Sequence, residues 1–69
     1  MYLAWYEPAK IPLEQKIEDA IQAYQRRHGR LPTIALCSAC DKGDVASVNG
    51  CKVDAHDMVR KNNVYVGVA

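Results

Sequence analysis

The first apolar segment of the chain, residues 2–6, has the pattern of a short strand. It is rich in aromatic residues and is ended by a Glu-Pro pair. Because successive side chains of a strand point to opposite faces, Leu3 and Trp5 should share one face and Tyr2 and Tyr6 the other. If the two tyrosines point away from the rest of the fold, the second face of the sheet is apolar and needs a partner or a second copy of the chain.

The next segment predicts one amphipathic helix over about residues 12–28. Pro12 suits the first helical position because its missing amide is harmless there. Basic residues precede Gly29, where a helix favours cations and where glycine favours its end. Apolar side chains recur three and four residues apart and form one stripe: Leu13, Ile17, Ala20, Ile21 and Tyr24. This stripe should pack the helix against a sheet.

The second half of the chain has the pattern of several strands. Residues 33–37 are β-branched or apolar on both faces, and residues 64–68 alternate valine with other residues. Between them, Asn49-Gly50 is the dipeptide that best tolerates the two positive φ angles of a type I′ hairpin turn. The resulting hairpin should place four side chains on one face: Ala46, Val48, Cys51 and Val53.

Two segments between the strands have less definite patterns. Residues 41–44, Asp-Lys-Gly-Asp, predict a turn or loop. Residues 55–63 favour either a helical turn capped by Asp54 or a short edge strand containing Met58 and Val59. Together the elements predict an α+β fold in which one amphipathic helix packs on a mixed sheet of about four short strands.

Composition and charge restrict the class of protein. A chain of 69 residues can form a single small domain, residues 1–69, and its 49% hydrophobic and 25% charged residues are close to the globular average. The net charge of +1 provides no strong field for nucleic acid or anionic lipid. The N-terminal apolar run is too short for a signal peptide or a membrane span, and three cysteines imply no disulfide framework. We therefore expect a cytoplasmic protein without membrane association.

One set of residues could bind a metal ion. Cys37 and Cys40 form a CxxC pair, and with Cys51 and His56 they make the Cys₃His ligand count of a zinc site. Free cysteine is, however, among the most buried residue types, and the strand patterns already assign Cys37 and Cys51 to apolar packing. We predict that the protein needs no cofactor, with a zinc-stabilised Cys₃His protein as the alternative.

The sequence gives little support for catalysis. In thioredoxin-like proteins a CxxC pair opens a helix whose N-terminus lowers the pKa of the first thiol, whereas here residues 41–44 and a hairpin follow. His56-Asp57 beside Cys40 or Cys51 is the one acid-base set, and neighbours in sequence rarely face one another. The sequence contains no phosphate loop, HExxH or GxSxG motif. We predict that the protein is not an enzyme.

Two groups of basic residues leave weak nucleic-acid binding as a further alternative. One group lies at the predicted helix end: Arg26, Arg27, His28 and Arg30. The other is Arg60 and Lys61, and Tyr24 or Trp5 is the candidate stacking partner for a base bound by these groups. Cations at a helix C-terminus are, however, expected from the helix dipole alone. The leading prediction is a noncatalytic interaction or accessory domain that binds an unknown protein partner or self-associates through a sheet face.

Overall fold

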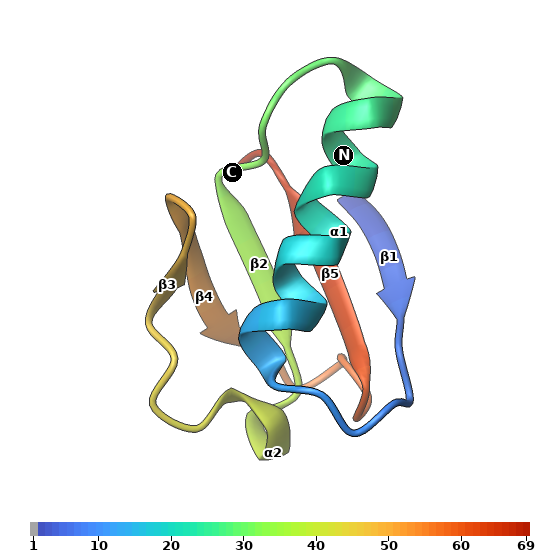
Figure 1. Cartoon of the computed structure of the whole chain (residues 1–69). Helices are drawn as coiled ribbons and strands as arrows, with labels where there is room; N and C mark the ends of the chain where they lie inside the picture. The colour runs from blue at the N-terminus through green and yellow to red at the C-terminus, as the bar shows by residue number, and fades with distance from the viewer. Residues whose placement is uncertain (1) are drawn as a thin grey trace.

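A computed structural model, which describes residues 2–69 and not Met1, consists of a helix layer on a mixed five-stranded sheet (Figure 1). Its elements are β1 (Tyr2–Tyr6), α1 (Leu13–His28), β2 (Ile34–Cys37), α2 (Ala39–Lys42), β3 (Ser47–Val48), β4 (Cys51–Ala55) and β5 (Asn63–Gly67). The strands lie in the order β1-β5-β2-β4-β3. The predicted α+β class is confirmed, with five strands rather than about four.

The last strand in the sequence, β5, lies inside the sheet. β5 pairs antiparallel with β1 on one side and with β2 on the other, so β1 and β2 run parallel with β5 between them. α1 connects these two parallel strands across one face of the sheet (Figure 1). β4 pairs parallel with β2, and β3 pairs antiparallel with β4. The two edges of the sheet are therefore β1 and β3.

α1 begins one residue later than predicted. Pro12 is its N-cap rather than its first helical residue, and the carbonyl of Pro12 accepts from the amides of Gln15 and Lys16. At the other end, Gly29 adopts a φ of 71° and its amide donates to the carbonyl of Gln25 at 2.8 Å. Glycine suits this left-handed position because it has no Cβ to clash. Neither helix of residues 2–69 is long and apolar enough to cross a membrane.

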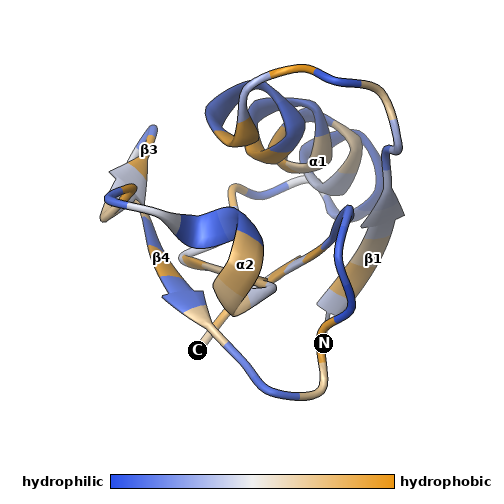
Figure 2. Cartoon of the chain, turned by 90° about the horizontal axis from the view of Figure 1, so that it is seen from below, coloured by the Kyte–Doolittle hydropathy of each residue, from blue (hydrophilic) through white to orange (hydrophobic). Residues whose placement is uncertain are grey.

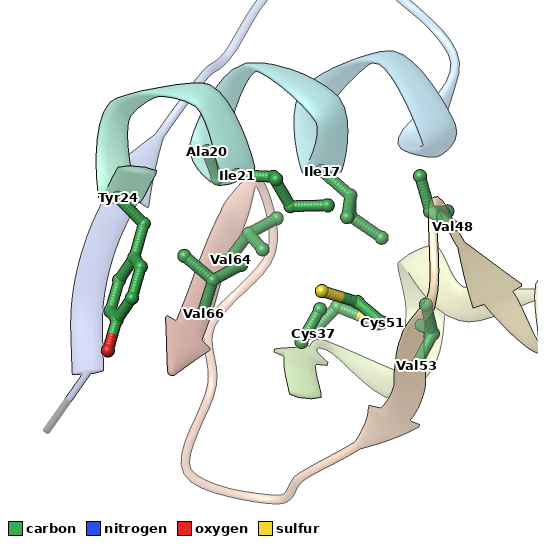
Figure 3. Packing of buried hydrophobic residues seen from close by; sticks show 11 residues of the cluster. Ile17, Ala20, Ile21, Tyr24, Cys37, Val48, Cys51, Val53, Val64 and Val66 are labelled. Carbon is green, nitrogen blue, oxygen red and sulfur yellow. The ribbon is translucent and has the colours of Figure 1, made fainter. Parts of the chain in front are cut away.

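The predicted stripe of α1 faces the sheet and forms the centre of the core (Figure 3). The buried cluster consists of Ile17, Ala20, Ile21, Tyr24, Ala35, Cys37, Val48, Cys51, Val53, Val64 and Val66. Leu3, Trp5 and Leu13 are partly buried against it. The predicted stripe and the predicted inward face of β1 are both confirmed, and Tyr2 and Tyr6 accordingly lie on the opposite face.

The predicted hairpin turn is present, with a shorter strand than expected. Asn49 and Gly50 have φ angles of 47° and 84°, and Val48 pairs with Cys51. β3 has only two residues, so Ala46 lies before the strand and is exposed rather than sharing the buried face. Its carbonyl still accepts a hydrogen bond from the amide of Val53 at 2.9 Å. The predicted register is correct, and of the four residues predicted to share a face only Ala46 is exposed.

The segment after β2 begins with a helical turn, α2, whereas the sequence predicted a turn or loop at residues 41–44. α2 begins directly after Ser38, whose hydroxyl accepts from the amide of Cys40 at 3.1 Å. Serine favours this N-cap position because it satisfies an amide that lacks a helical partner. Gly43 ends the turn. The CxxC segment therefore contains the start of a helix of only four residues, where the sequence predicted a turn or loop after Cys40.

Candidate functional site

The face of the sheet opposite α1, here called the open face, is apolar over its centre. Its apolar side chains are Tyr2, Ala4 and Tyr6 of β1, Tyr65 of β5, and Ile34 and Leu36 of β2, which alternate with the inward-facing residues of each strand. By the same alternation Asn63 of β5 and Lys52 and Asp54 of β4 also lie on this face, and the Lys52 ammonium is 3.6 Å from the Asp54 carboxylate. The register places Leu36 beside Tyr65 and Tyr65 beside Ala4. Tyr2 is 46% exposed and Tyr6 is 64% exposed. α1 lies on the other side of the sheet (Figure 2), and α2 lies at the ends of the strands (Figure 1).

The connection between β4 and β5, residues 56–62, borders the open face. It has neither the helical turn nor the edge strand that residues 55–63 predicted, because β4 continues through Ala55 and the chain then turns outward on the side away from α1 (Figure 2). The Nδ1 atom of His56 accepts from the amide of Met58 at 3.1 Å, which stabilises this turn. Val59 is buried, whereas Met58 is 82% exposed.

The sheet and this connection together border a hollow of about 260 Å³ that is open to solvent. Its lining residues come from three strands and the connection: Tyr2, Leu36, His56, Met58, Val59 and Tyr65. A cavity of about 150 Å³ is enough to admit benzene, so this hollow has room for an aromatic ring or a branched aliphatic side chain. Only the two tyrosines and His56 bring strong hydrogen-bonding groups to the lining. The arrangement suits a mainly apolar ligand group.

Asn62 attaches the connection to the rest of the fold. Its side-chain oxygen accepts a hydrogen bond from the Nζ atom of Lys16 at 3.1 Å. Its backbone amide donates to the Asp41 carboxylate at 2.8 Å, and its backbone carbonyl accepts from the backbone amide of Glu7 at 2.9 Å. Lys16 is only 7% exposed, so its hydrogen bond to Asn62 is made by a largely buried side chain of α1. Asn62 has a φ of 68°, which asparagine tolerates better than most residues. One residue thus positions the wall of the hollow against α1, α2 and the end of β1.

The sequence did not single out Lys16 or Asn62. The available signal was the pair Asn62-Asn63 directly before a valine-rich strand, since asparagine is enriched at left-handed positions. Asp41 and Lys16 are 21 and 46 residues away from Asn62 in sequence, and its third partner, Glu7, lies near the other end of the chain, so no local pattern could have identified them.

The structure does not gather the Cys₃His set. Cys37 and Cys51 are buried on the α1 side of the sheet, whereas Cys40 on α2 and His56 after β4 are exposed. In the parallel register Cys51 falls opposite Thr33, four positions before Cys37, which corresponds to about 13 Å along the strand. Within residues 2–69, no group of three or more His, Cys, Asp or Glu side chains is placed to hold a metal ion.

The environment of the buried thiols keeps them protonated. Burial, with a smaller contribution from the Asp41 carboxylate, raises the pKa of the Cys37 thiol. Burial also raises the pKa of the Cys51 thiol. A redox or nucleophilic cysteine needs the opposite shift, because the thiolate is the reactive form. α2 does not lower the pKa of Cys37, since this residue lies at the end of β2, before the N-cap Ser38.

We expect the protein, purified in reductant, to contain no stoichiometric zinc and to keep its fold in a strong chelator. Zinc binding by Cys37 and Cys51 would require both thiols to leave the core, at a large cost in packing. The measurements are zinc content and the amide spectrum before and after chelation.

Cys40→Ser is the control for zinc, because it removes one of the four proposed ligands at an exposed position and its urea midpoint should be close to that of the parent. One zinc per chain, with loss of spectral dispersion on chelation, would instead establish the Cys₃His alternative, since a structural zinc site couples binding to folding.

The two basic groups lie at opposite ends of α1. The contact between Lys16 and Asn62 places Arg60 and its neighbours near the start of the helix, whereas the other group lies in its last turn, about 15 Å further along the axis. Tyr24 is 3% exposed and therefore does not offer a ring for stacking bases; it contacts His28 instead, with ring centroids 4.4 Å apart. The described residues thus do not combine these groups into one basic, aromatic surface.

Comparison with known proteins gives no family for this chain. It matches no protein-family model, no curated protein and no solved structure. The functional proposal therefore depends on the open face and its hollow.

Proposed function

We propose that this protein is a noncatalytic interaction domain that binds its partner through the open face of the sheet. The observation that carries the proposal is the apolar hollow between the sheet and residues 56–62. An antiparallel or mixed sheet with helices on one side commonly presents polar side chains on the other, but here Leu36, Tyr65 and Tyr2 occupy that side. Apolar residues grouped around a hollow are typical of binding sites.

The lining of the hollow favours an apolar partner group. It contains no aspartate, glutamate, lysine or arginine side chain, so binding would depend on burial and shape rather than on ion pairs. Met58 is flexible and largely exposed, which allows it to close over groups of different shape. Tyr2 and Tyr65 offer rigid apolar rings with a polar tip, the combination that is common at protein interfaces. An aromatic or branched aliphatic side chain of a protein partner fits these features best.

The test uses N-acetyl-tryptophanamide as a probe for such a side chain. Its addition to ¹⁵N-labelled protein should cause saturable shifts of the amide signals of Leu36, Val59 and Tyr65. Leu36→Gln should weaken binding about tenfold, or about 1.4 kcal/mol, because it places an amide in the apolar lining. Leu31→Gln is the matched control, since Leu31 is 55% exposed in the segment between α1 and β2 and lies outside the hollow. Shifts that fail to saturate, or that are equal in both variants, would refute the proposal.

A further inference from the structure

The β1 edge of the sheet lacks the features that normally protect an edge strand. Natural edges are commonly short, charged, bulged or interrupted by proline, which prevents another strand from pairing with them. The opposite edge, β3, is only two residues long. β1 has five residues in unbroken register with β5, and none of them is charged or proline. Glu7 and Pro8 follow directly and limit any added pairing to these five residues.

The register identifies the backbone groups that point outward from this edge. The Glu7 amide donates to the Asn62 carbonyl at 2.9 Å, and these two residues continue the register of β1 with β5. Hydrogen-bonded and non-hydrogen-bonded pairs alternate along an antiparallel ladder. Leu3 and Trp5 therefore bond to β5, and the residues that alternate with them direct their amides and carbonyls away from the sheet.

The three outward residues are Tyr2, Ala4 and Tyr6. Within residues 2–69, none of their backbone groups takes part in a hydrogen bond with a turn, loop or side chain. All three side chains lie on the open face, so a strand added at this edge would extend the proposed binding surface. The edge thus offers both backbone pairing and an adjoining apolar face.

We propose that β1 of a second copy of this chain occupies the edge, antiparallel to the first, so that two sheets become one. The inference rests on the proposed function, because the open faces of the two copies then form a single surface. In the best register Ala4 lies opposite Ala4 of the second copy, and Tyr2 lies opposite Tyr6. All three outward residues then form hydrogen-bonded pairs with two bonds each, whereas a shift of two residues retains only two such pairs.

The side chains brought together in this register match one another. On the open face Tyr2 lies beside Tyr6 of the second copy, and on the α1 side Leu3 lies beside Trp5. Aromatic and aliphatic cross-strand pairs of this kind stabilise a sheet. The pairing also covers Tyr6, which is 64% exposed in the single chain, and brings it next to Tyr2 at the border of the hollow. The small Ala4 at the two-fold axis leaves room for the approach.

A second copy is favoured over an unrelated strand by symmetry. The edge requires an extended segment of about five residues with apolar side chains on both faces, and β1 itself is such a segment. Because both partners contribute the same surface, the contact closes as a dimer and leaves no further edge of this kind.

The first test measures mass in solution by sedimentation over a range of concentrations. The parent should change from the 7.7 kDa chain to twice that mass as concentration rises. Ala4→Pro removes one outward amide but no bond to β5, which is the position where an edge strand tolerates proline. It should weaken dimerisation at least tenfold while retaining the amide spectrum of a folded chain. A parent that stays at 7.7 kDa up to about 1 mM would overturn the inference.

The second test does not depend on proline and reports the register. Tyr2→Lys combined with Tyr6→Lys places like charges opposite each other at both ends of the pairing and should abolish the dimer. Tyr2→Lys combined with Tyr6→Glu changes the same exposed positions but places opposite charges together, and should retain it. A dimer that persists equally in both variants would mean that the copies meet elsewhere, which overturns the edge pairing. Binding of N-acetyl-tryptophanamide to a monomeric protein would preserve the proposed function while this inference fails.

Discussion

Replacing Ile17 by alanine should lower the free energy of unfolding by about 2 to 5 kcal/mol. Ile17 is fully buried at the centre of the α1 stripe, where it packs between the helix and the sheet (Figure 3). Removing its outer carbons loses their burial and leaves a cavity that the neighbours fill only in part. Because a domain of this size has a stability of roughly 3 to 5 kcal/mol, the variant should lose a large part of that stability.

The measurement is urea denaturation, with Gln22→Ala as the matched control. Gln22 lies on the exposed side of the same helix, so its replacement should change stability by no more than about 0.5 kcal/mol. Equal midpoints for the two variants would contradict the packing of α1 on the sheet.

Removing residues 63–69 should abolish cooperative unfolding altogether. β5 is the partner of both β1 and β2, and it contributes Val64 and Val66, two fully buried side chains, to the core. Without β5, β1 has no strand beside it and the apolar stripe of α1 loses the surface that it contacts most. The expected result is a shallow, non-sigmoidal thermal melt.

A chain that ends at Gly67 is the control for this truncation. It loses Val68, which is only partly buried, and the hydrogen bond from the Ala69 amide to the Thr33 hydroxyl at 2.9 Å, but keeps all of β5. It should melt cooperatively at a somewhat lower temperature. A sharp transition in the chain that lacks all of residues 63–69 would show that β5 is dispensable, contrary to the sheet order.

The elements that sequence predicted well are those whose determinants are local. The α1 stripe repeats every three or four residues, Gly29 terminates the helix by its own conformational freedom, and Asn49-Gly50 forms its turn through two adjacent φ angles. The α2 turn was missed although its determinant is also local. The Ser38 hydroxyl caps the turn, and of the Asp-Lys-Gly-Asp sequence only Gly43 and Asp44 lie outside the helix in a turn.

Strand order and the hollow depend on contacts between distant residues. The alternation of valines identifies β5 as a strand but does not show that it inserts between β1 and β2. The orientation of Tyr2 and Tyr6 followed from alternation, so an apolar second face could be foreseen. The wall formed by residues 56–62 could not, because its position depends on the bonds of Asn62 to Lys16, Asp41 and Glu7.

The central position of β5 has a consequence for the order of events during synthesis. β1 leaves the ribosome early, yet its neighbour in the sheet is made only after about sixty further residues have been added. Throughout that interval Tyr2–Tyr6 is an unpaired, apolar segment, and β2 lacks one of its two neighbours. Such non-local pairing slows folding and leaves strand edges open to wrong partners. The first strand of the sheet is therefore open to mispairing until the last strand has been made.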